Sequence, residues 1–127
     1  MFKNYSIRSD VEYYLDNFIK NEIIKVKDIC VNRLKNIEFL LFGSIAKGRF
    51  KNNSDIDILI LIEENKSVRE LRKLRHELED YIDNLNLSRD VDIKIYNKER
   101  YIELSKEVSF EQDIIKDLVN IRGWTCG

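Results

Sequence analysis

Apolar side chains recur with helical spacing in the first part of the chain, and the spacing changes to that of strands from residue 38. Between residues 10 and 35 they recur every three or four positions, which predicts a long amphipathic helix that begins at a capping box of Ser9 and Glu12. Residues 38–42 form a short apolar run, which predicts a strand. Residues 55–62 are apolar on both faces from position 58, which predicts a central strand of a covered sheet.

The next two elements are a helix and a strand with one polar face. Ser67 and Glu70 have the spacing of a second capping box, and the apolar stripe that follows predicts a helix as far as residue 85. Apolar and polar side chains then alternate over residues 90–95. This alternation predicts a third strand that buries one face and leaves the other polar.

The C-terminal part has two short helical patterns. They predict helices at residues 98–106 and 110–121, the second capped by Ser109 and stopped at Gly123. The chain contains no proline and no linker-like segment, so we expect a single domain over residues 1–127. The predicted order of elements indicates an α/β fold with a small mixed sheet of three strands or slightly more, packed with helices.

Composition narrows the class of protein without identifying it. The chain has 127 residues, of which 43% are hydrophobic and 35% charged, as in a globular protein. A formal net charge of -1 gives no electrostatic reason to expect direct nucleic-acid binding. No apolar run approaches the roughly 18–20 residues of a membrane span, and the N-terminus lacks a signal-peptide pattern. We therefore expect a cytoplasmic protein without a membrane partner.

A small-residue turn follows the first predicted strand. Gly43 lets the backbone approach a ligand closely, and Ser44 adds a hydroxyl at the start of a short helical segment. Backbone amides at such a turn bind phosphate groups. Taken alone, the same two residues also fit a glycine at a strand end followed by a serine cap.

Two carboxylates begin the second predicted strand. Asp55 and Asp57 are two positions apart, so their side chains lie on the same side of the strand. Two neighbouring carboxylates repel each other unless a cation lies between them, and hard oxygen ligands select Mg²⁺ or Mn²⁺. Taken alone, this pair also fits a solvated strand end.

The combination is more specific than either half. Gly43-Ser44, ten further residues and then Asp55-Ile56-Asp57 resemble the signature of the nucleotidyltransferase superfamily with the DNA polymerase β type of palm. The close match covers residues 43–57 and the wider one residues 37–96. Lys47 stands where that family usually carries arginine or lysine, and Ser54 also matches.

The resemblance implies a site and a reaction. The family has a third acidic residue on a later strand, where Asp92 fits and Asp90 is the alternative. Asp55, Asp57 and Asp92 would be the catalytic residues and would hold Mg²⁺ or Mn²⁺, and Asp92 could also take a proton from the acceptor hydroxyl. The nucleotide-binding residues implied are Gly43, Ser44, Lys47 and Ser54.

The chain is similar in extent to the minimal nucleotidyltransferase (MNT) group. That resemblance implies an antitoxin that moves AMP from ATP to a tyrosine of a HEPN-type toxin partner. The C-terminal residues 123–127 depart from the pattern and leave the partner-binding side open. Whether the chain also forms a homo-oligomer is likewise left open. Two alternatives remain: a nucleotidyltransferase with a small-molecule acceptor of the aminoglycoside type, and a non-catalytic member that only binds its partner.

Overall fold

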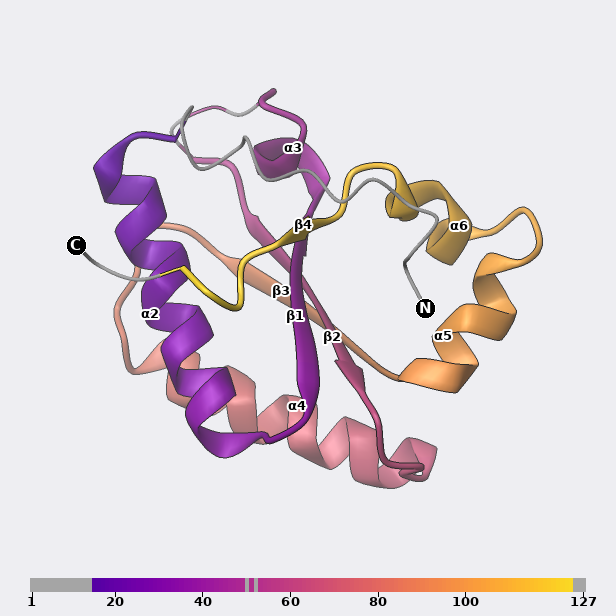
Figure 1. The fold of residues 1–127 in the computed structure, drawn as a ribbon. Helices are drawn as coiled ribbons and strands as arrows, with labels where there is room; N and C mark the ends of the chain where they lie inside the picture. Colours follow the sequence, from indigo (N-terminus) through magenta and orange to yellow (C-terminus); the bar gives the residue numbers. More distant parts are fainter. Residues whose placement is uncertain (1–14, 50, 52, 125–127) are drawn as a thin grey trace.

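The sheet has four strands, and its central strands carry the segments that the sequence singles out. The computed structural model describes residues 15–49, 51 and 53–124. In this part of the chain the strand order is β3-β2-β1-β4, with β2 antiparallel to β1 and parallel to β3, and β4 antiparallel to β1 (Figure 1). The strands are β1 (Ile37–Phe42), β2 (Ile56–Ile62), β3 (Val91–Asn97) and β4 (Val119–Asn120). β2 is an interior strand, which confirms the prediction from its two apolar faces.

Helices cover both faces of this sheet. α2 (Asn17–Arg33) and α4 (Val68–Asp83) pack on one face, whereas α5 (Lys98–Ser105) and α6 (Phe110–Ile115) pack on the other (Figure 1). The short helix α3 (Gly43–Ala46) follows β1 directly. The mixed α/β fold is therefore the predicted one, with one strand more than the smallest sheet that we expected.

The side chains of β2 are apolar on both faces, so both faces of this strand must be covered by helices. Its isoleucines at positions 56, 58, 60 and 62 belong to the core beneath α2 and α4. Leu59 and Leu61 belong to the second core, beneath α5 and α6. Asp57 shares the face of these two leucines because strand side chains alternate. One face of β2 thus changes from a half-buried carboxylate to a closed core within two residues.

The capping box of α4 is confirmed. The Ser67 hydroxyl accepts a hydrogen bond from the Glu70 amide at 3.1 Å, and the Glu70 carboxylate accepts one from the Ser67 amide at 3.1 Å. Two amides that have no partner inside the helix are satisfied in this way.

The predicted helix over residues 10–35 is wrong at its start. α2 begins at Asn17, because Asp16 has extended backbone angles and its carboxylate accepts a hydrogen bond from the Ile19 amide at 2.9 Å. Leu15 is buried outside the helix. The capping box proposed at Ser9 and Glu12 lies outside the described residues. An aspartate cap satisfies the first amides as well as a serine does, so the apolar spacing alone could not choose between them.

The predicted helix over residues 110–121 is also wrong in its second half. α6 ends at Ile115, and the chain then forms β4, in which Val119 pairs with Leu41 of β1. Gly123 therefore does not stop a helix. Trp124, 7% exposed, packs into the core beneath α2 and α4. The prediction of a single domain over the whole chain stays a prediction, since residues 1–14 and 125–127 are outside the described part.

Candidate active site

The glycine turn and the second carboxylate of the motif are in direct contact. Gly43 has a backbone φ of +80°, a conformation that side chains disfavour. A Cβ atom placed on Gly43 would collide with the Oδ2 atom of Asp57 and would lie 2.8 Å from its Cγ atom. The Asp57 carboxylate therefore occupies the space that any side chain at position 43 would need.

The sheet register brings the third carboxylate into the same row. Asp57 pairs with Phe42 of β1 on one side and with Asp92 of β3 on the other. Side chains paired directly across neighbouring strands lie close together on the same face. The predicted phosphate turn, Asp57 and Asp92 therefore lie side by side, although 35 positions separate the two aspartates along the chain.

The electrostatics of Asp57 reflect this crowding. Burial is the largest cause of a raised pKa, and the charges of Asp92 and then Asp55 add to it, so the pKa of Asp57 rises from 3.8 to about 6. Both neighbours make ionisation harder because they are also negative. Asp55 precedes β2, so the shared strand side that the alternation predicted for Asp55 and Asp57 stays a prediction.

A lysine that the sequence argument did not use is the counter-ion of this group. The Lys94 ammonium lies 3.6 Å from the Oδ2 atom of Asp92, and its charge lowers the pKa of Asp57. Lys94 is two positions after Asp92, so the two share the polar face of β3. That spacing is the signal that could have identified it. The side chains of Asp92 and Lys94 are 49% and 39% exposed, so this pair is open to solvent.

The structure separates the two alternatives for the third carboxylate. Asp92 is paired with Asp57 and affects its pKa. Asp90 precedes β3, and its carbonyl accepts a hydrogen bond from the Ile56 amide at 2.9 Å. Asp90 also lines a cavity of about 380 Å³ together with Glu79 and Asp83 of α4. This geometry favours Asp92 as the third member of the group.

The donor chemistry of these carboxylates fits a divalent cation of the Mg²⁺ type. Such ions prefer carboxylate oxygens and keep water or phosphate oxygens as further ligands. In the described part of the chain, no group of three or more His, Cys, Asp or Glu side chains is arranged closely enough to enclose a metal ion by itself. Asp55, Asp57 and Asp92 are nevertheless the residues that could hold it, because Asp57 combines burial with two negative neighbours and only Lys94 opposes them.

The predicted nucleotide-binding residues differ in how they are engaged. Ser44 lies in the first turn of α3, a helix that no side chain caps. The Lys47 ammonium lies 3.7 Å from Asp117, beside a cavity of about 320 Å³ that Arg49 and Lys116 also line. Ser54 is used locally, since its hydroxyl accepts a hydrogen bond from the Lys51 amide at 2.8 Å. The structure thus brings Gly43 and Asp57 together but leaves the roles of Lys47 and Ser54 as predictions.

A buried ion pair supports the segment that leads into Asp55, and sequence analysis missed it. The Glu22 carboxylate accepts hydrogen bonds from the Arg89 Nε atom at 2.8 Å and from the Ser88 amide at 2.7 Å. Arg89 also donates to the Ser54 carbonyl at 3.2 Å, immediately before Asp55. Glu22 and Arg89 are 67 positions apart, and no local pattern links them.

Comparison with known proteins agrees with this geometry. The sequence model of the family described as polymerase beta, nucleotidyltransferase, matches residues 24–118. This match spans most of the chain and includes both the glycine turn and the three aspartates. The chain belongs to the polymerase beta nucleotidyltransferase family.

Two individual proteins are similar to parts of the chain. A Methanocaldococcus jannaschii protein provisionally named protein adenylyltransferase MJ0435 is 42% identical over 57 residues, which are 45% of this chain. The match spans 56% of the length of that relative. A crystal structure of a toxin–antitoxin with AMP-PNP is 24% identical, with a TM-score of 0.39 over 69% of this chain and 68% of the other. That TM-score is too low for the likeness to carry an argument.

No helix in the described part of the chain is both long and apolar enough to cross a membrane.

Proposed function

We propose that the protein is a metal-dependent nucleotidyltransferase that moves a nucleoside monophosphate to an acceptor hydroxyl. The observation that carries this proposal is the contact of the Asp57 carboxylate with Gly43, in the same sheet row as Asp92. A phosphate turn and a metal-type carboxylate group must adjoin if one ion is to reach both the protein and a triphosphate. Family membership supports the same reaction class.

Each residue has a defined role in this proposal. Gly43 and Ser44 bind the outer phosphates of the donor nucleotide, and Asp55, Asp57 and Asp92 hold Mg²⁺ or Mn²⁺. A bound ion would neutralise the triphosphate and lower the pKa of the acceptor hydroxyl. The acceptor oxygen attacks the α-phosphorus as the bond to pyrophosphate breaks, and Asp92 takes the proton of the hydroxyl.

The donor and the acceptor follow from resemblance rather than from geometry. The name of the 42% identical relative supports ATP as donor and a protein as acceptor. The similarity in extent to minimal nucleotidyltransferases supports a tyrosine of a HEPN-type toxin as that acceptor. In this proposal the chain is the antitoxin of the pair and acts in the cytoplasm.

Transfer of label from α-labelled ATP tests the proposal. The chain is incubated with Mg²⁺ and an extract of its host, and the labelled protein and side chain are identified by mass spectrometry. We expect Asp57→Asn and Asp92→Asn to lower transfer by roughly a hundredfold or more, because a lost ligand removes several kcal/mol of transition-state stabilisation. Asp90→Asn, the matched control, should keep near wild-type transfer. Full activity of Asp57→Asn would refute the metal role.

Two glycines of equal backbone strain test the phosphate turn. Gly43 and Gly48 have φ values of +80° and +75°, so alanine strains the backbone similarly at both positions. The new methyl group would collide with Asp57 at Gly43, whereas at Gly48 no described atom beyond the adjacent residues lies within 4 Å of a Cβ. We expect Gly43→Ala to abolish label transfer and Gly48→Ala to retain most of it. Equal losses in the two variants would contradict a specific role for the turn.

A further inference from the structure

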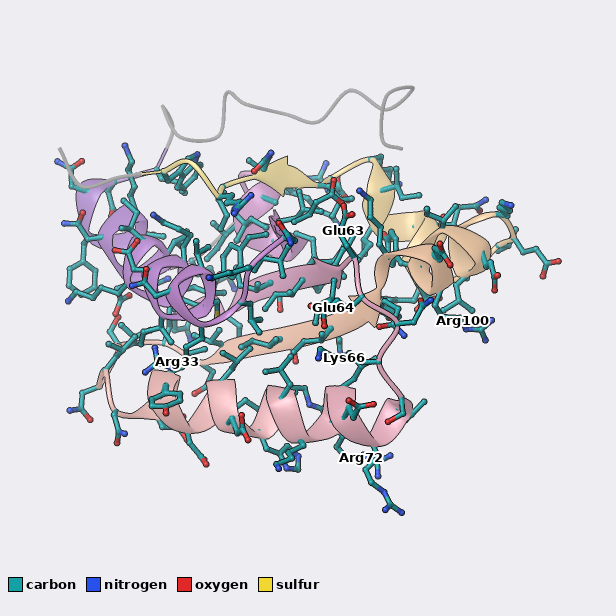
Figure 2. The ribbon with its side chains drawn as sticks, turned by 60° about the horizontal axis from the view of Figure 1, so that its bottom comes forward. Arg33, Glu63, Glu64, Lys66, Arg72 and Arg100 are labelled. Carbon is teal, nitrogen blue, oxygen red and sulfur yellow. The ribbon has the colours of Figure 1, made fainter. Side chains whose placement is uncertain are left out.

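A cationic cavity lies at the other end of the sheet from Asp57. It has a volume of about 620 Å³ and is formed by the start of α4, the end of β3 and α5. Four cationic side chains line it, and no Asp or Glu side chain does; the four are Lys66, Arg72, Arg75 and Arg100. Figure 2 shows Lys66, Arg72 and Arg100 at the same end of the molecule, on the loop before α4, on α4 and on α5. This local excess of positive charge occurs in a chain whose formal net charge is -1.

The charges of this cavity are weakly neutralised by the protein itself. Three of the cations pair with acidic side chains outside the lining: Lys66 with Glu64 at 3.3 Å, Arg75 with Glu79 at 3.7 Å, and Arg100 with Glu103 at 3.1 Å. Solvent-exposed pairs of this kind contribute little. Among the described residues Arg72 forms no ion pair, so its guanidinium group has donors to offer an anion.

The charge pattern of α4 also indicates a ligand. Its first two turns hold all of its Lys and Arg residues, namely Arg69, Arg72, Lys73 and Arg75, together with Glu70 of the capping box, and its last two turns hold Glu77, Glu79, Asp80 and Asp83. A helix macrodipole favours the opposite arrangement, with anions near the N-terminus and cations near the C-terminus. The helix therefore carries charges that work against its own stability, as residues do where function requires them. Ser67 and Glu70 already cap the start of α4, so an anion bound here would be attracted mainly by the cationic side chains.

Besides the cations and the polar groups of Ser67, Tyr96 and Asn97, the lining contains four aliphatic side chains. Val68 is 72% exposed, and Leu71, Ile95 and Leu104 are partly buried around the same cavity. A cavity of this volume is within the range of small-molecule sites, roughly 300–1,000 Å³. The lining thus suits a compact ligand that joins several negative charges to an apolar body.

We propose that this cavity is a second, metal-independent site for an organic phosphate of nucleotide size. Its phosphate groups are bound by Arg72, Arg75 and Arg100, and its apolar body lies on Val68 and Leu71. The site is separate from the aspartate group, because the lining residues Ile95 and Asn97 follow Asp92 by three and five positions on β3, or about 10 and 17 Å. It also differs in chemistry, since carboxylates need a cation before they can accept a phosphate and guanidinium groups do not. This inference does not depend on the proposed transfer reaction.

Amide chemical shifts of the ¹⁵N-labelled full chain test the proposal. ATP, tripolyphosphate and adenosine are titrated separately with EDTA present and about 0.15 M salt, which screens non-specific attraction. We expect saturable shifts with ATP at residues 66–72 and 95–100, and none at Gly43 and Ser44. Tripolyphosphate should shift the same amides more weakly, and adenosine alone should not bind.

Matched charge variants show whether the cavity is the site. Arg72→Gln and Arg100→Gln should each weaken ATP binding by about tenfold, the effect of losing one charge-assisted hydrogen bond. Lys73→Gln removes the same charge from α4 outside the cavity lining and should change the affinity less than Arg72→Gln does. Equal weakening by Lys73→Gln, shifts centred on Gly43, or no saturable binding would each overturn the proposal. Displacement of ATP by a lower concentration of an oligoglutamate peptide would overturn it in favour of an acidic protein segment.

Discussion

Two acidic side chains in this molecule, Glu22 and Asp57, are surrounded in opposite ways. Burial alone would raise the pKa of Glu22, but hydrogen bonds from the Ser88 amide and from Arg89 outweigh it and lower that pKa. Among the described residues no comparable set of donors surrounds Asp57: burial, then Asp92, then Asp55 raise its pKa to about 6. The protein neutralises one carboxylate from within and leaves the other among like charges.

The difference between the surroundings of Glu22 and Asp57 indicates where an external cation is expected. A buried charge is tolerated when it is paired and hydrogen-bonded, which Glu22 achieves with Arg89 at 2.8 Å. In the part of the chain that the structure describes, the one positive charge that lowers the pKa of Asp57 is Lys94, whose ammonium is paired with Asp92 and open to solvent. Perturbed groups of this kind cluster at functional sites. The site at Asp57 therefore has a deficit of positive charge that a divalent ion would correct.

The largest expected effect on stability comes from replacing Glu22, the carboxylate that is paired with Arg89. Glu22→Ala leaves the Arg89 guanidinium, 8% exposed as a residue, without its carboxylate, and should lower the free energy of unfolding by about 3–5 kcal/mol. Urea denaturation measures this loss. The double variant Glu22→Met/Arg89→Met should recover most of it, because the charge and its partner are removed together. A single variant as stable as the wild type would show that the network is not structural.

Removing the charge of Asp57 is expected to stabilise the protein, in contrast to removing that of Glu22. In the metal-free protein, Asp57→Asn should raise the free energy of unfolding above about pH 7, by roughly 1–3 kcal/mol after allowance for solvent screening. Asp90→Asn is the control and should stay within about 0.5 kcal/mol of the wild type. Destabilisation by Asp57→Asn would mean that the carboxylate is compensated, contrary to this account.

The pH dependence of this gain follows from linkage. The pKa of Asp57 is about 6 in the folded protein and 3.8 as the reference value for an unfolded chain. Between these values the folded state binds more protons, so the contribution of Asp57 to stability falls as the pH rises. The advantage of Asp57→Asn should therefore be small near pH 4, grow through pH 6 and level off above it. Urea melts of the two proteins across this range measure the difference, and an advantage independent of pH would contradict the assignment.

A smaller effect is expected at the partial counter-ion. Lys94→Met removes the charge that lowers the pKa of Asp57, so that pKa should rise above 6, with a loss of stability below about 1 kcal/mol. NMR titration of the Asp57 carboxyl carbon measures the pKa directly. Lys106→Met, at an exposed lysine beyond α5, should leave it unchanged. An unaltered pKa in Lys94→Met would remove Lys94 from the account of this site.

The elements that the sequence predicted well are those with local signals. The capping box at Ser67 located α4, and the apolar run from Ile58 located β2 inside the sheet. β4 was missed because its pairing with β1 is non-local, and because Ile115, Leu118 and Val119 have a spacing that also suits a helix. The start of α2 was missed because Asp16 competes with Ser9 as a cap.

The features of the candidate site also divide into those with a local sequence signal and those that depend on non-local contacts. Alternation was enough to place Asp57 and Asp92 on polar positions of their strands, and resemblance supplied their association. The contact between Gly43 and Asp57 needs the antiparallel register of β1 and β2, which no local pattern contains. The pair of Glu22 and Arg89 joins α2 to the segment before β3, so only the folded chain reveals it.

Binding of Mn²⁺ to the full chain tests the central claim most directly. Free Mn²⁺ is counted by electron paramagnetic resonance at pH 7.5 for the wild type, Asp57→Asn and Asp90→Asn, without nucleotide because ATP itself binds Mn²⁺. The account predicts saturable binding in the wild type and Asp90→Asn, and its loss in Asp57→Asn. Binding that survives unchanged in Asp57→Asn, or no saturable binding by the wild type, would contradict it.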